Sequence, residues 1–124
     1  MTNFLDSAII VDILRGYPPA VNWFAKQSVL AVSPVVWLEI IGGVRDRKAQ
    51  NEAVDLLTKF ERVAMAAEDF DRAIEQALRF RLSHGVDIMD CLIAAPCRRL
   101  EATLMTRNLK HFSVLLGDLV ERPC

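Results

Sequence analysis

The sequence predicts one α/β domain in which a short parallel β-sheet is flanked by α-helices. Three observations support this fold class. Short apolar segments alternate with longer segments whose apolar residues recur at helical spacing. Several helical segments start at cap residues such as Ser33-Pro34 and stop at glycines such as Gly16 and Gly85. The 124 residues are the usual size of one domain, and no linker or repeat divides residues 1–124.

The first half of the chain is expected to hold two strands that each lead into a helix. Asp6 and Ser7 are cap-type residues that follow the first apolar segment, and Ser33-Pro34 follows the second in the same way. The expected elements are a strand over 3–5, helices over 8–15 and 19–26, a strand over 29–32 and a helix over 35–41.

The second half shows longer amphipathic patterns. Phe70, Ile74 and Leu78 recur at helical spacing and are expected to face the core. The large aromatic residues also fit core positions: Trp23, Phe24, Trp37, Phe60, Phe70 and Phe80. The expected elements are a helix over 46–62, a short strand over 63–67, helices over 69–83 and 88–100, a strand over 102–106, a short helical or irregular segment over 109–116 and an edge strand over 119–120.

Composition narrows the class of protein. A 52% hydrophobic content with 25% charged residues excludes intrinsic disorder, and a formal net charge of −1 argues against general polyanion binding. No uncharged apolar run approaches the ~18 residues that a membrane span needs. Three cysteines at no metal-ligand spacing indicate reduced core thiols. With no basic, apolar leader, the expected location is the cytoplasm.

Three carboxylates occur in apolar surroundings: Asp6, Glu39 and Asp90. A buried carboxylate is unstable unless a cation, hydrogen-bond donors or water compensate its charge. Structural explanations remain open for each of them. Asp6 fits a helix N-cap, Asp90 fits an acid favoured in the first turn of a helix, and Glu39 fits the solvent side of a two-faced helix.

The order of these residues along the chain favours a functional explanation. Asp6 follows the first strand, Glu39 lies in the helix after the second, and Thr106-Arg107-Asn108 follow the last clear strand. Groups just beyond the carboxyl ends of parallel strands converge on one crevice. A pocket lined only by oxygen ligands favours Mg²⁺ or Mn²⁺, which can activate water against a phosphodiester.

At this point the sequence resembles the PIN-domain ribonucleases, and more narrowly the VapC-type toxins of type II toxin–antitoxin systems. Four motifs carry the resemblance, in family order and across nearly the whole chain. They read FLDSAIIVDILRG over residues 4–16, SPVVWLE over 33–39, DCLIAA over 90–95 and LMTRNLKHF over 104–112.

The resemblance implies a PIN-like fold and a metal-dependent endoribonuclease that uses Mg²⁺ or Mn²⁺. It also implies a homodimer, inhibited by a cognate VapB-like antitoxin. By position, Asp6, Glu39 and Asp90 match the metal ligands of the family. Together with Asn108 they match its catalytic residues, and Thr106 matches a small polar residue beside the site.

Two positions depart from the family pattern. His111 stands where an aspartate is often found, which puts the binding of a second metal ion in doubt. Pro96 lies inside a predicted helix, where proline removes a hydrogen bond and clashes with the preceding turn. Asp12 is interpreted as solvated surface. Asp87 is interpreted as an N-cap, or alternatively as a supplementary metal or water ligand.

The last third of the chain is locally basic. Arg98, Arg99, Arg107 and Lys110 are candidates for contacting the RNA backbone. The alternative is an ordinary solvated helix end, where cations are favoured.

Two competing hypotheses remain. One is a catalytically weakened PIN domain that acts as an RNA- or protein-binding regulatory module. The other is a phosphoacceptor receiver domain, which is also a small α/β fold with acids at its strand ends. The sequence disfavours the receiver because Asp6 stands alone at the first strand end.

Overall fold

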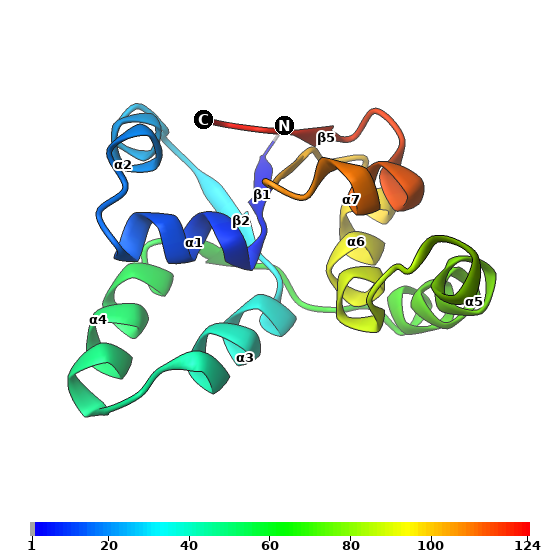
Figure 1. Cartoon of the computed structure of the whole chain (residues 1–124), viewed down its shortest axis with the longest axis horizontal. Helices are drawn as coiled ribbons and strands as arrows, with labels where there is room; N and C mark the ends of the chain where they lie inside the picture. Colours follow the sequence, from blue (N-terminus) through cyan, green and yellow to red (C-terminus); the bar gives the residue numbers. More distant parts are fainter. Residues whose placement is uncertain (1) are drawn as a thin grey trace.

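A five-stranded parallel sheet organises the chain, in the order β3-β2-β1-β4-β5 (Figure 1). The computed structural model describes residues 2–124 and confirms the predicted α/β class. Its strands are β1 Asn3–Leu5, β2 Leu30–Val32, β3 Glu61–Arg62, β4 Leu104–Met105 and β5 Val120–Glu121. Its helices are α1 Ser7–Leu14, α2 Pro18–Ala25, α3 Pro34–Gly43, α4 Arg47–Leu57, α5 Ala67–His84, α6 Ile88–Leu100 and α7 Leu109–Leu116.

Helices cover both sides of the central strands. In Figure 1, α1, α2 and α4 lie to the left of β1, α3 lies below it, and α5 to α7 lie to its right. β2 is therefore apolar along its whole length, and Leu30, Ala31 and Val32 are all buried. β3 lies at the sheet edge, which explains why its two residues, Glu61 and Arg62, are polar and exposed.

The parallel register brings the residues after each strand to one edge of the sheet. Leu5 pairs with Met105, so Asp6 and Thr106 both lie just beyond the paired residues. β2 is followed directly by Ser33, whose Oγ accepts a hydrogen bond from the Val35 amide at 3.1 Å and caps α3. Pro34 occupies the first turn of α3, as predicted.

The segment around β3 corrects one prediction. The helix expected over 46–62 ends at Leu57, and the strand expected over 63–67 is β3 at Glu61–Arg62. Helical periodicity alone did not reveal that Thr58 ends the helix or that Glu61 pairs with Ala31 of β2. Strand pairing at an exposed edge leaves little apolar signal in the sequence.

The face of α5 corrects a second prediction. Phe70, Ile74 and Leu78 were expected in the core, but their exposed fractions are 49%, 60% and 81%. The buried positions of α5 are Asp69 and two others, Ala73 and Gln76. The prediction was wrong because an apolar stripe does not reveal which of its sides the rest of the chain covers.

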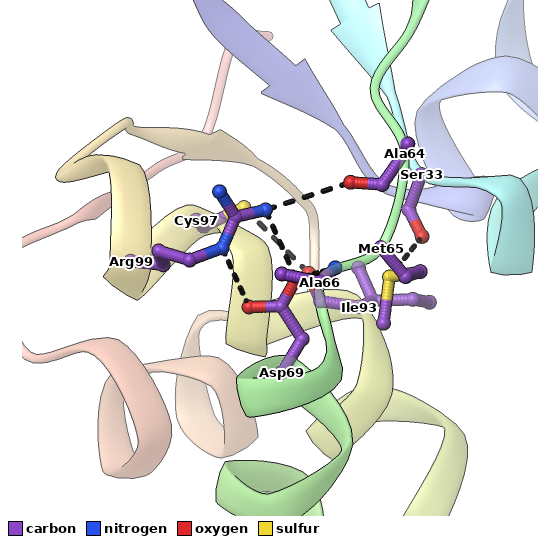
Figure 2. A network of polar contacts seen from close by, with 8 residues as sticks. All are labelled: Ser33, Ala64, Met65, Ala66, Asp69, Ile93, Cys97 and Arg99. Atoms are coloured by element: carbon purple, nitrogen blue, oxygen red, sulfur yellow. Dashed lines mark hydrogen bonds and ion pairs between the residues drawn. The ribbon is translucent and has the colours of Figure 1, made fainter.

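An ion pair between the half-buried Arg99 and the buried Asp69 fastens α5 to α6. The Asp69 carboxylate lies 2.9 Å from Arg99 Nε and 3.0 Å from Arg99 Nη2 (Figure 2). The second Asp69 oxygen also accepts the Ala66 amide at 2.8 Å, at the start of α5. Figure 2 shows the Arg99 side chain reaching from α6 to the first turn of α5. Asp69 is thus both a helix cap and the partner of Arg99.

Several other predictions concern single elements. α6 runs through Pro96 as one helix, and α7 is helical rather than irregular.

Cys91, Cys97 and Cys124 are free thiols, and the first two are buried. Within residues 2–124, no helix combines the length and the apolar character that a bilayer span requires.

Candidate active site

Asp6 occupies the point where β1 becomes α1. Its side chain is buried, with 6% exposure, although it is a carboxylate. One oxygen accepts the Ser7 amide at 2.8 Å and caps α1, while the other accepts the Thr106 hydroxyl at 2.8 Å. Asp6 is therefore an N-cap whose second oxygen is held by the segment after β4. The N-cap explanation is confirmed, and a role of Asp6 in metal binding stays a prediction.

Glu39 reaches the same place from α3. Its Oε1 accepts a hydrogen bond of 2.6 Å from the Ser7 hydroxyl. Ser7 thus donates its amide to Asp6 and its hydroxyl to Glu39, linking two acids that are far apart in the sequence. The side chain of Glu39 is half-buried, so its apolar sequence neighbourhood correctly indicated a carboxylate drawn inward.

Asp90 lies in the first turn of α6, after Asp87. Asp87 accepts the Met89 amide at 2.9 Å and is the N-cap of α6, as predicted. Burial, and then the negative charges of Asp6, Asp87 and Glu39, raise the pKa of Asp90 from 3.8 to about 7. Asp90 therefore belongs to one electrostatic cluster with Asp6 and Glu39. We call these three residues the acidic site.

Burial also raises the pKa of Asp6, and the charge of Glu39 adds to the effect. Hydrogen bonds from Thr106 and Ser7, and the more distant Arg107, act in the opposite direction. The fold thus concentrates negative charge while supplying few donors to compensate it. Such an arrangement favours a cation.

The metal ligands are not preset in a tight cage. Within residues 2–124, no three or more His, Cys, Asp or Glu side chains are grouped closely enough to hold one ion directly. The donor set nevertheless fits a hydrated Mg²⁺, which binds proteins through one or two carboxylates and keeps several waters. The oxygens of Asp6, Glu39 and Asp90 are donors of this type.

Asn108 lies beside the acidic site through Thr106. The backbone N–H of Asn108 donates to the Thr106 hydroxyl at 2.9 Å, and the Asn108 side chain caps α7. Its Nδ2 lies 3.4 Å from His111 Nδ1. The position of Asn108 after β4 agrees with the sequence prediction, and its observed contacts are those of a cap residue.

The four basic candidates have different environments. Arg99 binds Asp69, and Arg98 is half-buried, whereas Lys110 is exposed. Arg107 Nε lies 3.1 Å from Asp12 Oδ2. Asp12 was interpreted as solvated surface, which is wrong: it is 6% exposed. Its burial follows from the turn of α1 that faces the segment after β4, a contact that sequence spacing does not reveal.

Sequence reasoning understated two residues of this region. Ser7 joins Asp6 to Glu39, and Thr106 fixes the second oxygen of Asp6. Both are small polar residues directly after a strand or an acid, which was the available signal. Neither was among the predicted catalytic residues.

Comparison with known proteins identifies the family. The PIN domain model matches residues 4–115. Ribonuclease VapC19 of Mycobacterium tuberculosis is 36% identical over 116 residues, covering 87% of this chain and 90% of that protein. This chain therefore belongs to the PIN domain family, and within it VapC19 is a relative over most of the chain.

Solved structures agree on the fold. A toxin–antitoxin complex from Klebsiella pneumoniae gives a TM-score of 0.80 at 22% identity, covering 99% of this chain and 98% of that one. DNA-bound VapBC from Salmonella typhimurium gives 0.79 at 17% identity, covering 100% and 99%. The sheet order also excludes a receiver domain, whose strands run 2-1-3-4-5.

Proposed function

We propose that this chain is a divalent-metal-dependent endoribonuclease, the toxin of a toxin–antitoxin pair, that hydrolyses RNA phosphodiester bonds at the acidic site. The observation that carries the proposal is the clustering of Asp6, Glu39 and Asp90 at the carboxyl edge of the sheet, where the pKa of Asp90 is raised to about 7. Membership of the PIN family and the likeness to Ribonuclease VapC19 support the same activity.

The residues of the acidic site would hold Mg²⁺ or Mn²⁺ as follows. Asp6 is fixed by Ser7 and Thr106, so its carboxylate presents a defined direction to an ion. Glu39 is positioned by the Ser7 hydroxyl, and Asp90 completes the set from α6. When bound, the ion would activate water and stabilise the charge that develops on the phosphodiester.

Asn108 has a supporting part in this proposal. Its amide fixes the Thr106 hydroxyl, and that hydroxyl donates to Asp6. Through these two hydrogen bonds, the backbone of Asn108 helps to orient Asp6. Among the basic residues, Arg107 and Lys110 remain candidates for RNA contacts, whereas the Asp69 ion pair gives Arg99 a structural role.

The partners follow the same reasoning. The toxin–antitoxin complexes that share the fold support a cognate VapB-like antitoxin for this chain. A homodimer is supported by the exposed apolar stripe of α5, which includes Ile74, Leu78 and Leu82 with exposures of 60%, 81% and 87%. An uncovered stripe of this kind is typical of an interface. The three free thiols accord with a reducing cytoplasm.

Cleavage of a mixed structured-RNA pool tests the proposal. Purified protein stripped of antitoxin is incubated with Mn²⁺, with Mg²⁺ or with EDTA, alongside Asp90→Asn. Asp55→Asn, an exposed carboxylate on α4, is the matched control. We expect cleavage only with metal and only in the proteins that keep Asp90. Cleavage by Asp90→Asn would identify a contaminant, and silence without Mn²⁺ binding in calorimetry would favour the regulatory binding module instead.

A further inference from the structure

A pocket opens where the segments after β4 and β5 meet the C-terminal end of α1. It has a volume of about 490 Å³ and is rich in guanidinium groups. We call it the arginine pocket, and the lining residues that matter here are Asp12, Arg15, Tyr17, Arg107 and Arg122. Neither the proposed metal chemistry nor the family comparison uses this pocket.

Three different elements bring the arginines together. Arg15 is the C-cap of α1, Arg107 follows β4, and Arg122 follows β5. β4 and β5 are paired in parallel, with Met105 opposite Glu121. The residues that leave these two strands therefore emerge side by side, which sequence separation conceals.

Arginines outnumber acidic side chains in the lining of the pocket. Asp12 is the one acidic side chain among its lining residues, against three arginines. The carboxylate of Asp12 is buried, and its Oδ2 lies 3.1 Å from Arg107 Nε, which is an ion-pair distance without hydrogen-bond geometry. Arg15 and Arg122 are exposed, and Arg122 Nε donates to the carbonyl of Cys124 at 3.1 Å.

The arginine pocket is linked to the acidic site through the segment that follows β4. Arg107 directly follows Thr106, whose hydroxyl binds Asp6. Asp6 caps one end of α1 and Arg15 caps the other, a separation of roughly 14 Å along the helix at 1.5 Å per residue. A nucleic-acid strand lying along α1 would therefore meet both places.

We propose that the arginine pocket binds backbone phosphate of the RNA strand outside the scissile bond, with Tyr17 stacking on a base. This inference rests on the proposed function. Guanidinium groups match phosphate oxygens bidentately, and Tyr17 has 47% exposure, which leaves ring surface for a base. An acidic polypeptide would also satisfy the arginines, but it would make no use of an exposed aromatic ring beside a phosphodiester-cleaving site.

Binding of RNA at varied salt tests the inference. Asp90→Asn serves as the non-cleaving background, and the probe is a labelled 12-nucleotide single-stranded RNA of mixed sequence. Arg15→Gln/Arg122→Gln is compared with Arg47→Gln/Arg81→Gln, which removes two exposed arginines outside the pocket. Loss of two phosphate contacts lowers the slope of the logarithm of affinity against the logarithm of salt concentration by about 1.4. Relative to the wild type, the affinity loss of the pocket variant is therefore about 25-fold larger at 0.1 M salt than at 1 M salt.

Two further arms complete the design. Tyr17→Ala is expected to weaken binding about 5-fold or more without changing the salt slope, since stacking is not ionic. Equal salt slopes in the two double variants would overturn the inference. The inference would also be overturned if Arg15→Gln/Arg122→Gln kept its RNA binding but lost the binding of polyglutamate. That result would assign the pocket to an acidic polypeptide. Metal-dependent cleavage by the wild type is measured in parallel, because its absence refutes the proposed function separately.

Discussion

Replacing Asp90 by asparagine is expected to stabilise the metal-free fold, and to do so more at pH 8 than at pH 5. The pKa of Asp90 in the folded protein is raised from 3.8 to about 7, mainly by burial and then by the charges of Asp6, Asp87 and Glu39. The folded state therefore binds this proton more tightly than the unfolded state does. Ionising Asp90 opposes folding, and the stability is lost progressively as the pH rises from about 4 to about 7.

The difference between these two pKa values sets the upper limit of the effect. A change from 3.8 to about 7 corresponds to about 4 kcal/mol above pH 7. Asp90 is only half-buried, so screening by solvent reduces this to about 1–2 kcal/mol. For a domain of this size, the gain corresponds to an increase in Tm of about 4–8 °C. At pH 5 most of Asp90 is protonated in the folded state, and the gain is smaller.

Urea unfolding in EDTA at pH 5 and pH 8 measures this difference. The wild type is compared with Asp90→Asn and with Asp55→Asn, an exposed carboxylate on α4 that lies outside the acidic site. We expect a pH-dependent gain for Asp90→Asn alone. An equal gain at both pH values, or a destabilised Asp90→Asn at pH 8, would refute the raised pKa of Asp90 and its coupling to the neighbouring acids. Adding Mn²⁺ should stabilise the wild type more than the variant, because the ion neutralises the same repulsion.

Three other predictions concern separate parts of the molecule. Asp69→Ala should destabilise the fold by about 2–3 kcal/mol in urea unfolding, because it removes a helix cap and the partner of Arg99; an effect below about 0.5 kcal/mol would contradict this role. Thr106→Val should lower metal-dependent cleavage at least about tenfold near neutral pH, because loss of the hydroxyl leaves the pKa of Asp6 higher. Cleavage should recover at higher pH, and Thr106→Ser should restore it. A cleavage rate of Thr106→Val that does not change with pH would count against this role. Leu78→Glu should convert a dimer to a monomer in sedimentation velocity, whereas an unchanged sedimentation coefficient would remove α5 from the interface.

The acidic site was largely accessible from the sequence because its determinants are local. Asp6 and Thr106 directly follow short apolar strands, and parallel pairing brings such residues to one edge. Glu39 was identifiable because a carboxylate inside an apolar helical run requires a partner. The identity of that partner was not accessible, because Ser7 and Glu39 are joined across two helices by a hydroxyl that fits many roles.

Local patterns in the chain were enough to predict the alternation of strands and helices, since apolar periodicity and cap residues act within a few positions. Which faces are covered became clear only from the packed fold. Leu78 lies in an apolar stripe yet is exposed, and Asp12 is a carboxylate yet is buried against Arg107. Both outcomes depend on segments that are distant in the sequence. The exposure of a side chain, and therefore its contribution to the stability of the fold, is set by the residues that surround it in space.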